Sequence, residues 1–140
     1  MASKVFLDTA YAIALSSSKD AYHSRALQLA AYLRAQNIQL LTTRAILLEI
    51  GNALSKLRYR SAAVRLLIAL ETDPNVEIVP LTEHIYLRAL QLYQEREDKE
   101  WGLTDCISFT VMGDEGITEA LTTDGHFRQA GLRALLLEEV

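Results

Sequence analysis

The chain opens with the stretch Lys4-Val5-Phe6-Leu7-Asp8-Thr9, in which a short apolar run ends at an acid. We predict a buried strand over residues 4–7 and a helix over residues 9–15 that follows it directly. An apolar run followed by a helical stretch then recurs along the chain. Strands that alternate with helices are typical of a parallel sheet whose two faces are covered by helices.

Hydrophobic spacing and turn residues predict the other elements. Further strands are expected at Ile38–Leu41, Val76–Val79, Glu119–Thr122 and Arg133–Leu137. Further helices are expected at Tyr22–Leu33, Ile46–Leu57, Ser61–Leu70, from Pro80 past Leu92, Thr104–Met112 and Gly125–Ala130, with Asn37 as a stop signal after the first of these. The sequence therefore predicts one α/β domain over residues 1–140.

Composition narrows the class of protein. With 140 residues, half of them apolar, the chain can bury a substantial core. Its formal net charge of -4 means that nucleic acid would be bound only through a local basic patch or a metal. Cys106 is the single cysteine, which excludes an intrachain disulfide and fits a reducing compartment. No apolar run approaches about 18 residues and no signal-peptide core is present, so we expect a cytoplasmic protein without membrane contact.

Four acids stand where charge is rarely placed without a function: Asp8, Glu49, Asp105 and Asp124. Asp8 and Asp124 end predicted strands. Asp105 lies in the first turn of a predicted helix with Thr104 as its N-cap, and Glu49 lies a turn into another helix. Ligands of open α/β sheets bind beyond the carboxyl ends of the strands. We expect the four side chains to converge there, in a nest of carboxylates that a hard divalent cation would make tolerable.

Each of these acids also has a purely structural interpretation. The two that precede helices would serve as N-caps. Asp105 would stabilise the helix dipole, and Glu49 would reach Lys56 or Arg44 on an exposed helix face. Singly, none of the four is specific for a site, and the functional hypothesis depends on all four meeting in one crevice.

At these residues the sequence resembles the PIN-domain family, and within it the VapC-type toxin ribonucleases. The resemblance rests on four segments, which are Val5–Thr9, Leu48–Leu54, Leu103–Phe109 and Thr123–Phe127. Their order and spacing agree with the family over nearly the whole chain. The third and fourth segments are the more specific ones.

The resemblance implies a parallel sheet of about five strands flanked by helices on both faces. It implies metal-dependent endonucleolytic cleavage of RNA, such as transfer RNA, by the toxin of a type II toxin–antitoxin pair, with 5′-phosphate and 3′-hydroxyl products. It also implies Mg²⁺ or Mn²⁺ as cofactor, a cognate antitoxin as partner, and a homodimer. Residue by residue, it maps the catalytic metal ligands onto Asp8, Glu49, Asp105 and Asp124, and the supporting hydroxyls onto Thr9 and Thr104.

Basic residues that follow Glu49 are candidates for contact with the RNA backbone: Lys56, Arg58 and Arg60, with Arg65 further along. A solvated helix face is the alternative interpretation of this group. For Arg44 and Arg128, elsewhere in the chain, the structural interpretation is favoured.

The remaining reactive residue types are predicted to be structural. The histidines lack metal-ligand spacing: His23, His84 and His126. Cys106 has no apparent histidine partner that would make it a nucleophile, and Trp101 is expected to be a packing anchor.

Two competing functions follow from the same residues. One is a non-catalytic PIN module that binds RNA or a protein partner, against which the intact acidic set argues. The other is a phosphatase of the haloacid-dehalogenase kind, which also places an Asp at the end of its first strand. That family requires an acidic residue or Thr two positions after the Asp, and Ala10 stands there.

Overall fold

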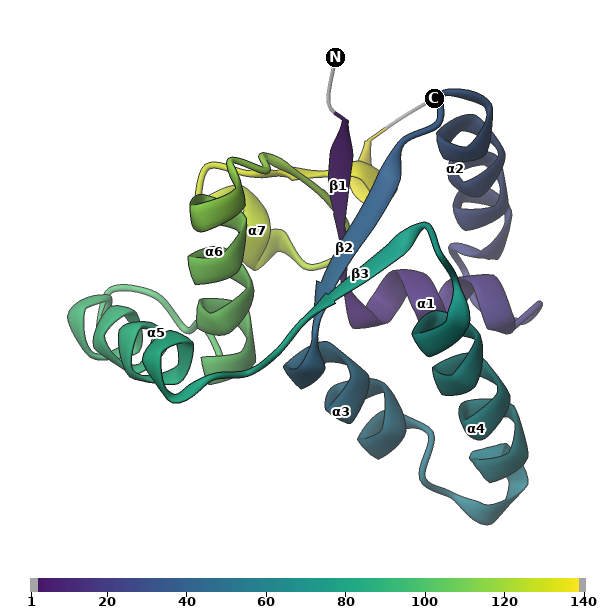
Figure 1. Ribbon diagram of the computed structural model, residues 1–140, viewed down its shortest axis with the longest axis horizontal. Helices are drawn as coiled ribbons and strands as arrows, with labels where there is room; N and C mark the ends of the chain where they lie inside the picture. Colours follow the sequence, from purple (N-terminus) through teal and green to yellow (C-terminus); the bar gives the residue numbers. More distant parts are fainter. Residues whose placement is uncertain (1–2, 139–140) are drawn as a thin grey trace.

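The computed structural model describes residues 3–138, and its centre is a five-stranded sheet in which all neighbouring strands run parallel (Figure 1). The strand order is β3-β2-β1-β4-β5. The strands are β1 (Lys4–Leu7), β2 (Gln39–Thr43), β3 (Val76–Val79), β4 (Glu119–Leu121) and β5 (Arg133–Ala134). The fold class predicted from the sequence is confirmed.

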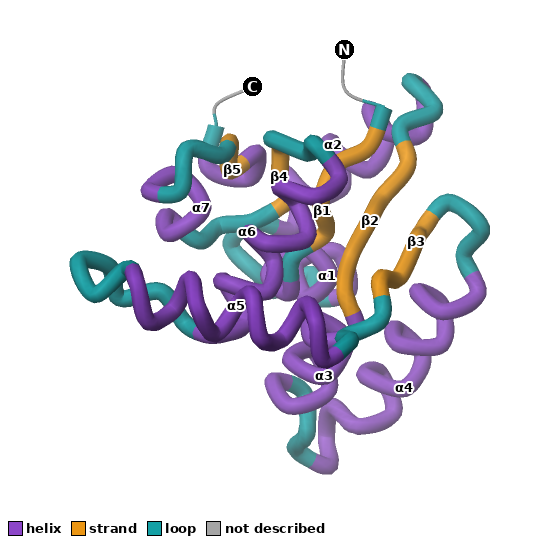
Figure 2. Tube along the Cα trace, turned by 60° about the vertical axis from the view of Figure 1, so that its left-hand side comes forward, coloured by secondary structure: helices purple, strands orange, loops and turns teal. Residues whose placement is uncertain are grey.

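Helices cover both faces of this sheet. They are α1 (Thr9–Ser16), α2 (His23–Ala35), α3 (Arg44–Ala53), α4 (Leu57–Thr72), α5 (Glu83–Glu95), α6 (Leu103–Glu115) and α7 (Gly125–Gln129), followed by a 3₁₀ turn, η1 (Leu135–Leu137). Figures 1 and 2 show α1, α2 and α4 on one side of the strands and α5, α6 and α7 on the other. Within residues 3–138, every helix is too short or too polar to cross a lipid bilayer.

The first strand is the centre of the core because it lies between β2 and β4 and is covered on both faces. Val5, Phe6 and Leu7 are at most 2% exposed. Consecutive apolar residues are what a strand buried on both faces requires, whereas a half-exposed strand would alternate with polar residues. This is why a run as short as residues 4–7 is enough to predict the element.

Two buried threonines allow β2 to pass into α3 without a loop. The Thr42 hydroxyl donates to the carbonyl oxygen of Leu7 at 2.8 Å, which satisfies an acceptor at the end of β1. The Thr43 hydroxyl accepts from the backbone N–H of Ile46 at 3.2 Å and thereby caps the first turn of α3. The helix that carries Glu49 is therefore tied directly to the carboxyl end of the sheet.

A row of aromatic rings joins the main core to a smaller cluster beneath α5 and α6. Phe6 and Phe127 have ring centroids 6.3 Å apart, Phe127 and Phe109 are 5.0 Å apart, and Phe109 and Trp101 are 4.9 Å apart. The Trp101 indole N–H also donates to the side-chain oxygen of Gln129 at 3.0 Å. The predictions that Trp101 anchors the packing and that Cys106 is a buried helix residue are confirmed.

The structure corrects the expected helix Ile46–Leu57. α3 ends at Ala53, and α4 begins at Leu57 rather than at Ser61. Leu57 was expected on the buried face of one long helix, but it is 86% exposed at the turn between two helices. Lys56 adopts an extended backbone conformation that ends the helical path, and α4 can then run back against α3 and the sheet.

Two further expectations are wrong in detail. The residue before the first turn of α6 is Gly102, not Thr104, so Thr104 lies inside the helix. The expected strand Arg133–Leu137 is a two-residue strand followed by η1. A 3₁₀ turn lets the consecutive residues Leu135 and Leu136 both enter the core, whereas a strand would direct them to opposite faces.

Asn37, expected as a stop, has a positive φ of 54° just after α2.

Substitution by alanine should change the free energy of unfolding in opposite directions at two glycines, one inside α6 and one at its end. Gly113 lies inside the helix on its exposed face, and an added Cβ would meet nothing within 4 Å, so Gly113→Ala should stabilise the protein by about 0.5–1 kcal/mol. Gly116 ends the helix at φ +66°, where an L-residue costs about 1–2 kcal/mol. Urea unfolding of the wild type and both variants measures these changes in the free energy of unfolding, and the dependence on urea concentration should stay the same. Equal effects of the two substitutions would contradict the assignment of the helix end.

Candidate active site

The four acids predicted from the sequence come from four different elements at the carboxyl end of the sheet. Asp8 follows β1 directly and Asp124 follows β4, the neighbouring strand. Asp105 is the third residue of α6, and Glu49 is the sixth residue of α3. Contacts among these side chains and their neighbours link all four into one cluster.

Asp8 is the most buried member of the cluster, with 8% of its surface exposed. The Thr122 hydroxyl donates to its Oδ2 at 2.6 Å, and the same hydroxyl accepts from the backbone N–H of Asp124 at 3.0 Å. Thr122 thus connects the ends of β1 and β4. Asp8 occupies the N-cap position of α1, but its side chain makes no capping hydrogen bond, so the N-cap interpretation is wrong for this residue.

Burial is the main reason that the pKa of Asp8 rises from its ordinary value of 3.8 to about 7. The charges of Glu49 and Asp105 raise this pKa further, while the hydrogen bonds from Thr122 and from the Thr9 backbone lower it. A carboxylate whose pKa is raised in this way lacks a compensating positive charge.

Asp105 in α6 and Asp124, which directly precedes α7, both lie next to the side chain of His126. Asp105 Oδ2 accepts from the backbone N–H of Gly102 at 3.1 Å and lies 3.0 Å from Nδ1 of His126. The same nitrogen lies 3.3 Å from Asp124 Oδ1, which also accepts from the His126 backbone N–H at 2.9 Å. Asp124 therefore is an N-cap, as its structural interpretation held, and it is a member of the cluster as well.

The pKa of Asp105 is raised above its ordinary value, first by burial and then by the charge of Asp124. Hydrogen bonds from His126 and from the Gly102 backbone act in the opposite direction. Potential ligand atoms of Asp105, Asp124 and His126 all lie within 4.8 Å of one another, close enough to hold one metal ion.

Glu49 joins the cluster through Thr9, whose hydroxyl donates to the Glu49 carboxylate. The alternative partners proposed for Glu49 are not used. Arg44 pairs with Glu71, and Glu49 forms no ion pair with any residue in the range 3–138. Thr9 thus contacts one of the four acids, and its supporting role in the reaction stays a prediction.

Two residues at the site were not identified from the sequence. Thr122 is fully buried against Asp8, and His126 bridges two acids although its sequence spacing is not that of a metal ligand. Thr104, expected as a supporting hydroxyl, makes no side-chain hydrogen bond to the acids within the described chain. A hydroxyl residue two positions before Asp124 was the available signal for Thr122, and for His126 the signal was its place two positions after Asp124, inside the segment Thr123–Phe127.

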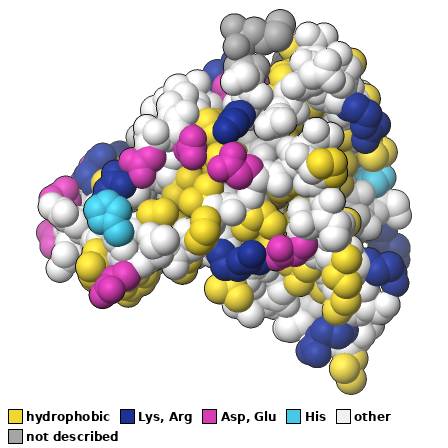
Figure 3. Space-filling view, viewed as in Figure 1, with side chains coloured by type: hydrophobic (Ala, Val, Ile, Leu, Met, Phe, Trp, Pro, Cys, Tyr) yellow, Lys and Arg dark blue, Asp and Glu magenta, His cyan; other side chains and the backbone are white. Residues whose placement is uncertain are grey.

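The candidate RNA-binding cations lie at the turn between α3 and α4. Lys56, Arg58 and Arg60 are all exposed, and over residues 3–138 none of them pairs with a carboxylate. Arg58 lies over the ring of Tyr59 at 4.8 Å, and Arg60 donates to the carbonyl of Ser55 at 2.6 Å. Figure 3 shows dark blue side chains next to exposed apolar ones in this lower right part of the molecule.

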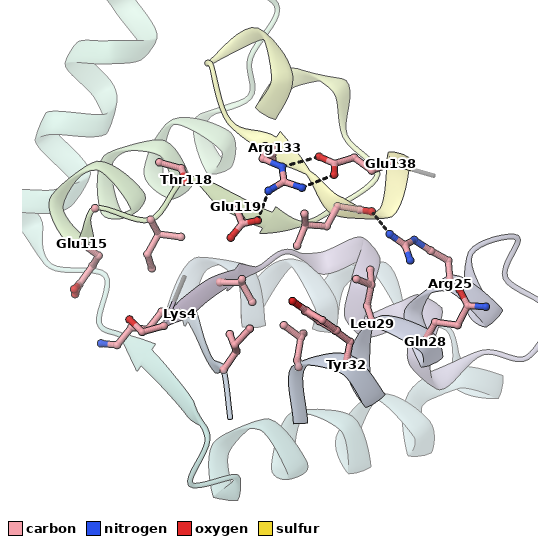
Figure 4. Close-up of a pocket in the computed structure, with 17 residues that line it drawn as sticks. Lys4, Arg25, Gln28, Leu29, Tyr32, Glu115, Thr118, Glu119, Arg133 and Glu138 are labelled. Atoms are coloured by element: carbon pink, nitrogen blue, oxygen red, sulfur yellow. Dashed lines mark hydrogen bonds and ion pairs between the residues drawn. The ribbon is translucent and has the colours of Figure 1, made fainter. Parts of the chain in front are cut away.

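A groove of about 1320 Å³ lies away from the acids, at the amino end of the strands between α2 and the β4–β5 edge (Figure 4). Lys4 and Glu119, the first residues of β1 and β4, both line it. Arg133 on its rim is paired with Glu119 and Glu138 (Figure 4). None of the four acids lines this groove, so it is separate from the candidate active site.

Comparisons with known proteins identify relatives of this chain. Over 128 residues the chain is 30% identical to the 23S rRNA-specific endonuclease VapC20 of Mycobacterium tuberculosis, and the match covers 91% of this chain and 94% of that protein. The crystal structure of the same relative, described as a sarcin–ricin loop cleaving toxin, superposes with a TM-score of 0.80 at 27% identity over 91% of this chain and 95% of that one.

A second solved structure shares the fold at lower identity. It is VapBC2 from Rickettsia felis bound to a DNA fragment from its promoter, with a TM-score of 0.66 at 16% identity over 94% of this chain and 96% of that one. The family model described as PIN domain matches residues 5–132, a range that contains all four acids and both threonines that touch them. The chain therefore belongs to the PIN-domain family, as the sequence predicted.

Proposed function

We propose that this protein is a metal-dependent endoribonuclease of the VapC type, which hydrolyses phosphodiester bonds of RNA. The observation that carries the proposal is the direct linkage of Asp8, Asp105 and Asp124 through Thr122 and His126, at the carboxyl end of the sheet. The similarity to an rRNA-specific endonuclease over nine-tenths of the chain supports it.

The chemistry of the donor set fits a divalent metal ion. The cluster offers carboxylate oxygens, which are the ligands that Mg²⁺ and Mn²⁺ prefer. Within residues 3–138, no Lys or Arg side chain pairs with Asp8, Asp105 or Asp124. Burial first, and then the charges of Glu49 and Asp105, raise the pKa of Asp8, and no cation among the described residues opposes them. The residues that would hold the ion are Asp8, Glu49, Asp105 and Asp124. When bound, such an ion supplies an activated water for in-line attack and neutralises charge on the phosphoryl group.

The protein's own contribution is to fix the orientation of the carboxylates. Thr122 holds Asp8 from one side by a 2.6 Å hydrogen bond, and Thr9 holds Glu49. Both donors are neutral, so they orient the acids without cancelling the charge that attracts a cation. The exposed cations Lys56, Arg58 and Arg60 would contact the phosphates of an RNA that reaches the site.

The proposed substrate is a structured RNA. The relative's substrate makes the large-subunit ribosomal RNA the first candidate for this chain, and transfer RNA, which the sequence suggested, is the second. The proposed partner is a cognate antitoxin that occludes the site, by analogy with the toxin–antitoxin complex that shares the fold. A phosphatase of the haloacid-dehalogenase kind is no longer a candidate, because the chain belongs to a different family.

The first functional prediction is cleavage that depends on metal and on the acids. The purified protein should cut RNA in Mg²⁺ or Mn²⁺, leaving 5′-phosphate ends, and excess EDTA should stop the reaction. Asp8→Asn and Asp105→Asn should each lower the rate by at least about 100-fold, since each removes a charge that the transition state requires.

Glu77→Gln is the matched control for this experiment. Glu77 lies on the edge strand β3, away from the acids, and pairs with Lys4. The variant should cleave at the wild-type rate. Cleavage that survives EDTA would refute the metal mechanism. Binding of RNA without any cleavage would favour the non-catalytic PIN module instead.

A second prediction concerns stability against pH in the absence of metal. Asp8 has a pKa of about 7 in the folded protein and an ordinary value of 3.8, so between these values the folded state binds more protons than the unfolded state. The free energy of unfolding therefore falls as pH rises through this window, by at most about 1.4 kcal/mol per pH unit. This contribution is fully present below pH 4 and lost above pH 7. Relative to wild type, Asp8→Asn should gain stability from pH 4 to pH 8 in urea titrations with EDTA.

Metal should reduce that stability difference at neutral pH. Mn²⁺ at about 100 times its Kd should stabilise the wild type by about 2.7 kcal/mol, and Asp8→Asn should gain much less. A stability difference between the two proteins that is independent of both pH and Mn²⁺ would show that Asp8 is a structural residue only.

The third prediction concerns assembly. Apolar side chains are exposed on α3 and α4, where Leu57 is 86%, Leu48 59% and Ile68 57% exposed, and on α5, where Leu87 is 53% exposed. Surfaces of this kind are typical of protein–protein interfaces. We propose a homodimer that leaves further apolar surface for the antitoxin. Sedimentation velocity at micromolar concentration should show a dimer, and a monomer alone would contradict the proposal.

A further inference from the structure

His126 links two acids that belong to different helices. Its side chain, one-third exposed, projects from the second residue of α7, and Nδ1 lies 3.0 Å from Asp105 Oδ2 in α6 and 3.3 Å from Asp124 Oδ1. The contact with Asp105 is a hydrogen bond, and Asp124 Oδ1 lies within ion-pair distance of the same ring nitrogen. A neutral imidazole that carries its proton on Nδ1 can make this contact, so no positive charge on the ring is required.

The two acids need such a link because they repel each other. The charge of Asp124 is the second cause, after burial, of the raised pKa of Asp105. The groups that oppose this are the His126 side chain and the Gly102 backbone N–H. In the part of the chain that the structure describes, His126 is the one side chain that forms a hydrogen bond or ion pair with both carboxylates, a hydrogen bond to Asp105 and a 3.3 Å ion-pair contact with Asp124.

The surrounding structure keeps His126 in place. The next residue, Phe127, is fully buried between Phe6 and Phe109, and the His126 backbone N–H donates to Asp124 Oδ1 at the start of α7. The imidazole is therefore carried by a short helix that is fixed on both sides. This anchoring fixes the backbone from which the imidazole reaches Asp105.

We propose that His126 is a positioning residue of the metal site, whose Nδ1–H holds the Asp105 and Asp124 carboxylates together so that they meet a divalent cation preassembled. This inference rests on the proposed function and adds a residue to it. In this role His126 acts through the two carboxylates, because its Nδ1 is engaged with Asp105 rather than free to bind the ion. Hydrogen-bond partners of metal ligands typically contribute about 10–100-fold to metal affinity.

The test uses Mn²⁺ as the probe and affinity as the readout. The Kd for Mn²⁺, measured on the full chain by electron paramagnetic resonance of the free ion, should rise about 10–100-fold in His126→Ala. His126→Asn places an N–H near the position of Nδ1 and should restore most of the affinity. His126→Gln places its N–H near the position of Nε2 and should not. The exposed His84 on α5 is the matched control, and His84→Ala should leave the Kd unchanged.

Three results would contradict the positioning role of His126. An unchanged Kd in His126→Ala, or equal rescue by Asn and Gln, would overturn the positioning role. So would a ¹⁴N modulation from imidazole in the electron spin echo of bound Mn²⁺, which would make His126 a direct ligand. Circular dichroism and melting in EDTA verify that each variant is folded. If the wild type itself neither binds Mn²⁺ nor cleaves RNA, the proposed function fails. If the wild type binds Mn²⁺ and His126→Ala binds it equally well, only the positioning role fails.

Discussion

The hydrogen bond from the Thr122 hydroxyl to Asp8 Oδ2 is the interaction on which the candidate site depends. It is 2.6 Å long, it is buried, and it joins residues 114 positions apart in the chain. It exists because β1 and β4 are parallel neighbours whose carboxyl ends lie side by side. The same hydroxyl accepts from the Asp124 backbone, so one side chain aligns acids from both strand ends.

All the donors that touch the acids can be neutral. Thr9, Thr122, the Gly102 backbone and His126 each orient a carboxylate without bringing a fixed positive charge. An arginine or lysine in these positions would satisfy the acids permanently and compete with a metal ion. In the metal-free protein, burial disfavours the charged form of Asp8 and of Asp105, and the neighbouring carboxylates add to this effect, so the pKa of both acids is raised. Charge of this kind costs stability and is characteristic of functional sites.

The rigidity of the site comes from the core beneath it. The row of rings from Phe6 through Phe127 and Phe109 to Trp101 lies under the two helices that carry Asp105 and His126. Cys106 and Phe127, which adjoin these two site residues in sequence, are both fully buried. The acids are thus attached to well-packed positions, and small neutral donors are enough to fix their final orientation.

The sequence by itself determined the alternation of strands and helices, the parallel sheet, the four acids and the family, because each of these depends on local patterns. The family assignment and the prediction of a VapC-type endoribonuclease are confirmed by the comparisons, while the roles of the individual acids stay predictions. Only the tertiary structure decided the break before Leu57, the turn at Leu135–Leu137, and the contacts of Thr122 and His126. Periodicity records which side of its own element a residue buries. It carries no information on which distant element that side contacts. Those contacts are set by the strand order and by the packing of helices on the sheet.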